Sequence, residues 1–218
     1  VVSGDKAGVV TVWNAAFGRL IRTLQAHTKA VTALTLSPDG ATIATVGGEG
    51  KLCLWSRNTG KKLQEVTLSN GEVSTLFFAQ DGRTLFACLG SSLISWRVIS
   101  LLNGARNLYI EKEQPLGATP FQVAAVSPDG KRLALGAADA TLHIWNLLEK
   151  HEESTIAVSE FPITALTWTP DSAWVAAGDS DGNMRVWEAV TSKPRPYVCK
   201  ARAKIRALGF SSNSKVLV

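Results

Sequence analysis

Few residues of this chain have the types and spacing that chemistry requires. His27, Thr45 and Glu49 supply an imidazole, a hydroxyl and a carboxylate, the groups that a hydrolase uses as base, nucleophile and orienting acid. Nothing adjacent in the sequence supplies an oxyanion hole or a substrate pocket for them. The sequence also lacks GxxxxGKS, GxxxxGKT and HExxH, and no GxGxxG follows a strand. We therefore predict a chain that is not an enzyme, with no catalytic residue and no cofactor.

Four carboxylates recur at a regular interval and look at first like an acid–base series: Asp39, Asp81, Asp129 and Asp171. Each stands inside a short turn, of which the first reads Ser-Pro-Asp-Gly at Ser37 to Gly40. Pro38 presets the backbone for the second position of a type I turn, and Gly40 closes it. Turn chemistry explains these aspartates, and acid–base catalysis does not.

The turns mark a repeat that organises the whole chain. They start at residues 37, 79, 127, 169 and 211, at steps of 42, 48, 42 and 42. Five tryptophans keep a similar interval: Trp13, Trp55, Trp96, Trp145 and Trp187. Around the first complete turn, the runs Val31 to Leu36, Ala41 to Val46 and Lys51 to Trp55 alternate with period two. This alternation predicts three short strands in each repeat.

The repeat is similar to that of the WD-repeat β-propeller family. The family's motifs stand here as Ala26-His27, Ser37 to Gly40, Asp181-Gly182, Trp13-Asn14 and Trp187-Glu188. The resemblance implies an all-β fold of WD-type four-stranded blades, with about five repeats of period ~42 and incomplete first and last blades. We expect one propeller segment over 1–218: a half blade 1–29, blades 30–71, 72–120, 121–161 and 162–203, and a half blade 204–218.

The first and last repeats are expected to be partial. Val1 to Ser3 fits the end of a second strand, Ile205 to Phe210 a first strand, and Lys215 to Val218 the start of a second. Two interpretations stay open. The chain is a segment of a longer propeller, or a five-bladed ring closes between its ends.

The resemblance also gives His27, Thr45, Glu49 and Trp55 a structural role, as a buried hydrogen-bonded tetrad that rigidifies the blade. Trp13, Trp96, Trp145 and Trp187 would close the third strands of the other blades. Two of those blades depart from the pattern. Gly117 falls where the His belongs, and Leu135 and Ala177 fall where the hydroxyl belongs. Such blades must rely on apolar packing between neighbours, and Trp168 is expected to pack there.

The third repeat is irregular. Its extra residues lie in the stretch Arg97 to Pro120, where we predict an outer strand near Asn107 to Glu111 and then a loop. Insertions in propellers lie at blade edges or rims, where they often carry binding specificity. A longer outer strand with a solvated loop is the alternative.

Composition suits a turn-rich globular protein, with 45% hydrophobic and 19% charged residues. The cysteines Cys53, Cys88 and Cys199 are far apart, and His143 and His151 are expected to be exposed, so neither a disulfide framework nor a metal site is indicated. No apolar stretch reaches the length of a membrane span, and no leader opens the chain. We expect an intracellular protein, cytoplasmic or nuclear, with no membrane or small-molecule partner.

The clearest charge feature is a basic set near the end of the chain: Lys193, Arg195, Lys200, Arg202, Lys204 and Arg206. The run from Lys200 to Arg206 alternates base and small or apolar residue, which predicts a positive ladder on one face of a strand and its following loop. With a net charge of +5, this ladder could meet nucleic acid or an acidic protein. A solvated outer strand that discourages edge pairing is the alternative, and Tyr197 is its single aromatic neighbour.

These observations favour a non-catalytic scaffold or adaptor that docks protein partners of a multi-subunit complex on a rigid propeller. By resemblance, partners would use the face made by the loops before first strands and between second and third strands. In this chain that candidate partner face contains Asp5, Lys6, Lys29, Glu49, Glu160, Phe161 and Asp179. The alternative is a component of an RNA-processing or ribosome-assembly particle that contacts RNA or an acidic partner through the basic strand.

Overall fold

The computed structural model describes residues 1–68, 73–100, 106–116, 119–195 and 199–218, and every regular element within them is a β-strand. The all-β expectation is confirmed. The chain divides into two compact units, Val1–Leu116 and Gly117–Val218, and each is described by itself.

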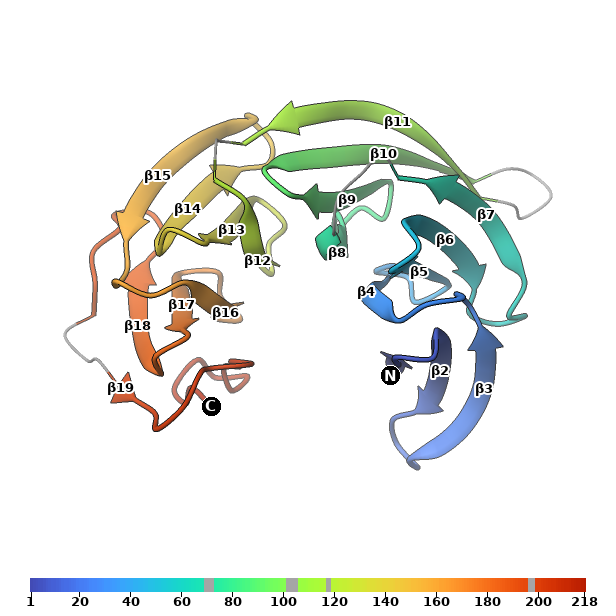
Figure 1. The fold of residues 1–218 in the computed structure, drawn as a ribbon, viewed down its shortest axis with the longest axis horizontal. Helices are drawn as coiled ribbons and strands as arrows, with labels where there is room; N and C mark the ends of the chain where they lie inside the picture. Colours follow the sequence, from blue (N-terminus) through green and yellow to red (C-terminus); the bar gives the residue numbers. More distant parts are fainter. Residues whose placement is uncertain (69–72, 101–105, 117–118, 196–198) are drawn as a thin grey trace. The chain divides into compact units, whose positions relative to one another are not determined.

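The first unit contains three antiparallel sheets, in which the strands lie side by side in chain order (Figure 1). The first sheet consists of β1 (Val2–Gly4), β2 (Val9–Asn14) and β3 (Arg19–Gln25). The second consists of β4 (Val31–Leu36), β5 (Thr42–Gly47), β6 (Lys51–Ser56) and β7 (Lys62–Thr67). The third consists of β8 (Val73–Phe78), β9 (Thr84–Leu89), β10 (Ser92–Ser100) and β11 (Arg106–Pro115).

The second unit contains two further antiparallel sheets of four strands each. One consists of β12 (Phe121–Val126), β13 (Arg132–Ala137), β14 (Thr141–Asn146) and β15 (His151–Ala157). The other consists of β16 (Ile163–Trp168), β17 (Trp174–Asp179), β18 (Asn183–Glu188) and β19 (Cys199–Lys200). Together the two units show the repeated four-stranded antiparallel sheets that the sequence predicts for propeller blades.

The recurring turn connects the first two strands of each four-stranded sheet and is held by its own side chains. In the second sheet the Gly40 amide donates to the Ser37 carbonyl at 2.7 Å, and the Ala41 amide donates to Asp39 Oδ1 at 2.9 Å. Gly40 has a φ of +66°, in the left-handed region that glycine adopts without steric cost. The turn therefore has the local chemistry that the sequence predicts.

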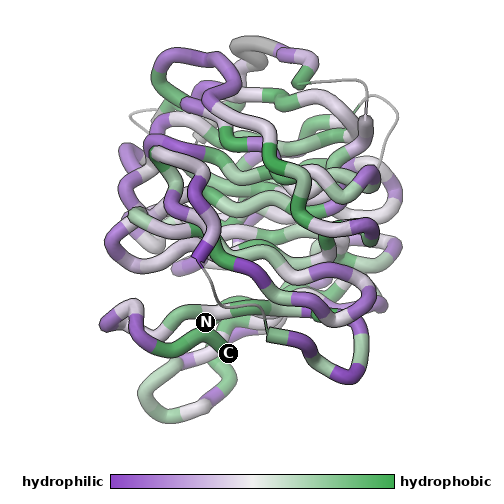
Figure 2. The backbone as a smooth tube through the Cα atoms, turned by 90° about the vertical axis from the view of Figure 1, so that its left-hand side faces the viewer, coloured by the Kyte–Doolittle hydropathy of each residue, from purple (hydrophilic) through white to green (hydrophobic). Residues whose placement is uncertain are grey.

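The core lies between neighbouring sheets within each unit. Leu52 and Leu54 of β6 pack in one cluster with Leu85 of β9 and Trp96 of β10. In the second unit, Ile144 of β14 shares a cluster with residues of the next sheet. Apolar residues, green in Figure 2, follow the strands, while hydrophilic residues gather at the connecting loops. Burying each large aliphatic side chain contributes about 1.5–3 kcal/mol, so packing between sheets dominates the stability of each unit.

Two of the predicted strand positions need correction. Ile205 to Phe210 and Lys215 to Val218 form no strands, and between them only one isolated bridge pairs Phe210 with Leu217. A period-two pattern becomes a strand only where a neighbour supplies a full ladder of hydrogen bonds, and the described residues offer this stretch no such neighbour. The outer strand predicted near Asn107 to Glu111 is present as the longer β11, and residues 101–105 of the insertion lie outside the described residues.

Candidate functional site

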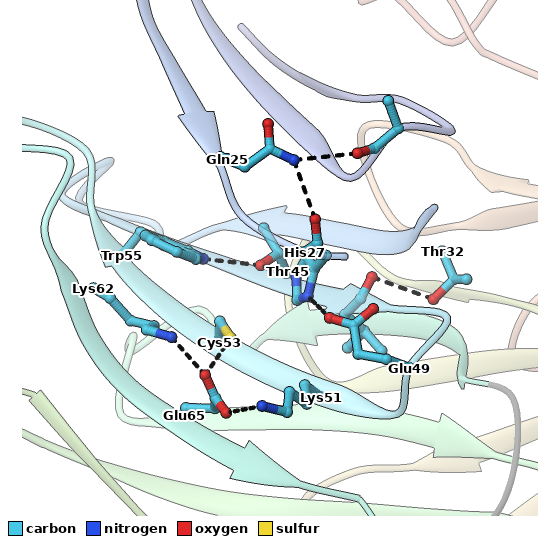
Figure 3. A network of polar contacts seen from close by, with 12 residues as sticks. Gln25, His27, Thr32, Thr45, Glu49, Lys51, Cys53, Trp55, Lys62 and Glu65 are labelled. Carbon is cyan, nitrogen blue, oxygen red and sulfur yellow. Dashed lines mark hydrogen bonds and ion pairs between the residues drawn. The ribbon is translucent and has the colours of Figure 1, made fainter. Parts of the chain in front are cut away.

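The four residues of the tetrad come together in the second sheet (Figure 3). His27, in the loop before β4, places Nε2 2.8 Å from Thr45 Oγ1 of β5 and Nδ1 2.7 Å from Glu49 Oε1 in the β5–β6 turn. The Trp55 indole nitrogen of β6 donates to the same Thr45 oxygen at 2.9 Å. One polar chain therefore connects the entry loop of this sheet to two of its strands and the turn between them.

The charge state of the tetrad is set by its surroundings. Burial alone would raise the pKa of Glu49, but hydrogen bonds with its own backbone amide and with His27 outweigh this effect, so the pKa lies below its usual value. Gly47 makes the approach possible, because a Cβ there would lie 2.4 Å from Glu49 Oε2 and 2.5 Å from His27 Nδ1. The ionised carboxylate therefore faces the imidazole directly.

The tetrad has the groups of a catalytic triad but not the access that catalysis requires. Thr45 is fully buried and the His27 side chain is 0% exposed, so a substrate carbonyl cannot reach the hydroxyl. The hydroxyl oxygen also already accepts the Trp55 proton. The arrangement holds strands together, and as built it cannot attack a substrate.

The other blade-closing tryptophans differ in whether they find a hydroxyl. Trp13 of β2 donates to Ser3 Oγ of β1 at 3.0 Å, a partner that the sequence analysis did not identify. Within the part of the chain that is described, the indole nitrogens of Trp96 and Trp145 are buried with no hydrogen-bond partner. In the strand-pairing register, Ala87 and Leu135 occupy the positions in these two sheets that Thr45 occupies in the second sheet. Gly117, expected at the place of His27 in the fourth repeat, lies outside the described residues.

The prediction that His143 is exposed is wrong. Its side chain is 16% exposed, with Nε2 2.8 Å from Thr141 Oγ1 and Nδ1 2.5 Å from Glu152 Oε1. Thr141 in turn donates to Asp139 Oδ1 at 2.5 Å. The sequence signal that could have predicted these hydrogen bonds is the alternation that places Thr141 and His143 on the same face of one strand. His151 is exposed as predicted, and within the described segments no group of three or more His, Cys, Asp and Glu residues could hold a metal ion.

The four recurrent aspartates all accept a hydrogen bond from the amide two residues ahead: Asp39, Asp81, Asp129 and Asp171. For Asp171, hydrogen bonds from Thr169 and from the Ala173 amide hold the carboxyl pKa below its usual value. A cleft of about 350 Å³ lies between two of these turns, and its lining includes Asp39 and Asp81. Because both carboxylates accept turn amides, the cleft contains no converging acid–base pair.

The residues of the candidate partner face differ in their exposure to solvent. Four of its residues are exposed in the loops that the resemblance points to: Lys6, Lys29, Glu160 and Phe161. Asp5 is also exposed, although its carboxylate accepts the Ala7 and Val9 amides. Glu49 is largely engaged by His27.

Asp179 does not belong to an accessible face. It is 0% exposed, and its Oδ1 accepts the amides of Asp181 and Asn183 at 2.9 Å each. Burial would raise its pKa, but hydrogen bonds from the Asn183 side chain and amide hold the pKa below the usual value. The carboxylate therefore shapes the β17–β18 turn from inside, and a partner cannot contact it.

The basic set does not form one strand. β19 contains only Cys199 and Lys200, and the residues from 201 to 208 form no strand. Pro194 bridges to Trp187 and Lys200 pairs with Asn183, so the two ends of the set lie four residues, or about 13 Å, apart along β18. Lys193 and Arg195 thus lie at one end of the sheet and Lys200 at the other. Tyr197 lies outside the described residues.

Comparisons with known proteins agree with this architecture. A family profile described as "WD domain, G-beta repeat" matches residues 18–56, 117–146 and 152–188. The small ribosomal subunit protein RACK1 of Caenorhabditis elegans is 29% identical over 150 residues, which are 67% of this chain and 46% of that protein. The chain therefore spans about half the length of this curated relative. None of the described segments forms an apolar helix of the length that crossing a bilayer requires.

Proposed function

This chain is a WD-repeat protein of the β-propeller type, and from that premise we propose that it is a non-catalytic scaffold that docks protein partners on the loops at one end of its sheets. The observation that carries the proposal is the tetrad. A buried hydrogen-bonded chain fixes the loop before β4 to the strands behind it, so the loop is rigid before any partner arrives. A rigid loop surface loses little conformational entropy on binding, which suits docking.

The docking surface in the first unit is formed by two neighbouring loops. The Val31 amide donates to the Asp5 carbonyl at 3.0 Å, and the amides of Ala26 and His27 both donate to the Gly8 carbonyl. Lys6 and Lys29 project from these two joined loops, and neither forms an ion pair within the described residues. Two exposed cations on a fixed backbone offer a partner contacts that need no rearrangement.

The test is affinity purification of the protein from its native source, with and without nuclease. The double variant Lys6→Glu/Lys29→Glu is expected to lose protein partners that survive nuclease. Lys61→Glu is the matched control, because Lys61 is exposed beside the β6–β7 turn, at the other end of the second sheet. Retention of every partner by the double variant would overturn this docking surface.

A second candidate is a component of a ribosome-associated or other RNA particle. Two observations favour it: the name of the relative, a small ribosomal subunit protein, and the exposed cations of the basic set. Loss of every partner on nuclease treatment would place this function first. Its affinity for RNA should then fall linearly with the logarithm of salt concentration.

A further inference from the structure

Two loops of the last sheet hold one short turn between them. On one side the Ser180 amide donates to the Pro162 carbonyl at 3.0 Å. On the other side the Ala201 amide donates to the Gly182 carbonyl at 2.8 Å, and the Ile205 amide donates to the Asp179 carbonyl at 3.1 Å. The loop before β16 and the loop after β19 therefore border the same β17–β18 turn.

The loop after β19 is fixed, although it forms no strand. Ile205 is only 8% exposed and packs on Gly178, where a Cβ would lie 2.5 Å from Ile205 Cγ2. Thr164 also donates to the Ile205 carbonyl at 2.5 Å. With Ile205 anchored, the side chains on either side of it point to solvent.

The charges of this loop are unbalanced. From Cys199 to Leu208 the sequence contains four cationic residues and no acid. Lys200 pairs with Asp181 at 2.8 Å, while Arg202, Lys204 and Arg206 are exposed and form no ion pair within the described residues. Three free cations therefore lie on an anchored backbone beside the β17–β18 turn.

The loop before β16 contributes an apolar side chain. Phe161 is 40% exposed, and the Ser159 hydroxyl fixes its backbone by donating to the Phe161 carbonyl at 3.0 Å. Glu160 is exposed on the same loop, so the anionic groups of a partner are favoured on the side of Arg202 and Lys204. The surface is thus cationic on one side and apolar on the other.

We propose that this surface, formed by Phe161, Arg202, Lys204 and Arg206, binds an acidic peptide segment of a protein partner, with carboxylates on the cations and an apolar side chain against Phe161. The inference rests on the proposed function and names the chemistry of one partner. A nucleic acid fits less well, because Lys193 and Arg195 lie at the far end of β18, about 13 Å from Lys200, so the described cations of the basic set are divided between the two ends of the sheet.

The test is fluorescence anisotropy with a labelled ten-residue peptide of glutamates and two leucines. Competing probes are the same peptide with serine in place of leucine, and a single-stranded oligonucleotide of equal charge. Arg202→Glu/Lys204→Glu should weaken binding of the first peptide at least tenfold, and Phe161→Ala several-fold. Lys193→Glu/Arg195→Glu, at the other end of the sheet, should leave it unchanged.

Three results would overturn the proposal: equal affinity of the Arg202→Glu/Lys204→Glu variant, equal affinity for the serine peptide, or tighter binding of the oligonucleotide. The test is separable from that of the proposed function. If the Lys6→Glu/Lys29→Glu variant loses native partners while the leucine peptide fails to bind, the scaffold function stands and only this surface is wrong.

Discussion

In the second sheet, the hydroxyl oxygen of Thr45 accepts a hydrogen bond from the indole nitrogen of Trp55 at 2.9 Å. The same oxygen lies 2.8 Å from His27 Nε2. In contrast, the buried indole nitrogens of Trp96 and Trp145 find no partner within the described residues. The second sheet is therefore fastened by a polar chain, while these two sheets depend more strongly on apolar packing against their neighbours.

Replacing Thr45 by valine should destabilise the protein by about 2 kcal/mol, because the variant keeps the shape but leaves two buried nitrogens, Trp55 Nε1 and His27 Nε2, without their acceptor or donor. The measurement is the free energy of unfolding from urea titration. Thr45→Ser keeps the hydroxyl and should recover most of the loss. Equal unfolding free energies of Thr45→Val and the unmodified protein would show that the tetrad adds nothing to stability.

Much of the fold was predictable because it is periodic. The interval between turns and tryptophans placed the strands around Thr45 and Trp55, and the resemblance to the WD-repeat family implied the contacts of the tetrad. The same reasoning could have found Ser3, which stands ten residues before Trp13 just as Thr45 stands ten before Trp55. Here the signal was present in the sequence and was not used.

The wrong predictions have one physical cause, because the exposure or strand formation of each residue concerned depends on contacts between segments. Asp179 reads as a loop aspartate, but it is buried where two loops border its turn. The stretch after Ile205 alternates like a strand, but among the described residues only one isolated bridge, from Phe210 to Leu217, pairs with it. His143 alternates outward on its strand, but Glu152 of the next strand covers it. A period predicts which face a residue takes, and it does not predict what lies against that face.

Glu65 should give the protein a stabilising contribution that depends on pH. Hydrogen bonds from Lys51 and Lys62 lower the pKa of Glu65 from its usual value of 4.5 to about 2. Because the folded-state pKa is depressed, the contribution is complete above pH 4.5 and is lost as the pH falls towards 2. The difference in unfolding free energy between the unmodified protein and Glu65→Gln should therefore shrink across that interval. Urea titrations at several pH values measure this difference.

The control for this pH dependence removes the cations instead of the carboxylate. Lys51→Met/Lys62→Met should abolish the same acid-dependent contribution, since both donors to Glu65 are lost. If the difference between Glu65→Gln and the unmodified protein stayed constant from pH 6 to pH 2.5, the two ion pairs would be irrelevant to stability.

Trp168 connects two sheets of the second unit and should be sensitive even to a conservative change. It is 5% exposed, and its indole nitrogen donates to the Ala125 carbonyl of β12 at 2.9 Å. Trp168→Phe removes this donor and should cost about 1–2 kcal/mol of unfolding free energy, whereas Trp168→Ala should cost about 3–5 kcal/mol. Trp174→Phe is the control, because Trp174 is less buried and its ring lies under the Arg195 guanidinium, 4.1 Å from ring centroid to Cζ. Equal losses for the two phenylalanine variants would contradict a special role of Trp168.

Gly182 lies in the β17–β18 turn, which borders the loop after β19, and Gly18 lies in the β2–β3 turn. The two glycines provide a matched pair of substitutions. Both have positive φ, +89° and +61°, but their surroundings differ. A Cβ at Gly18 would meet nothing within 4 Å, whereas one at Gly182 would lie 2.6 Å from the Ala201 carbonyl oxygen. Lys150 and Ser192 already occupy the place of Gly18 in other turns, with φ of 59° and 56°.

Gly18→Ala should therefore cost only the left-handed backbone penalty, about 1 kcal/mol. Gly182→Ala should cost at least about 2 kcal/mol more, because the clash is with backbone and can be relieved only by moving the loop after β19. That movement would break the hydrogen bond from the Ala201 amide to the Gly182 carbonyl and displace Arg202. Gly182→Ala should then weaken binding of the acidic peptide, while Gly18→Ala leaves it unchanged. A folded Gly182→Ala protein with full peptide affinity would mean that Arg202 and Lys204 bind the peptide without the fixed backbone.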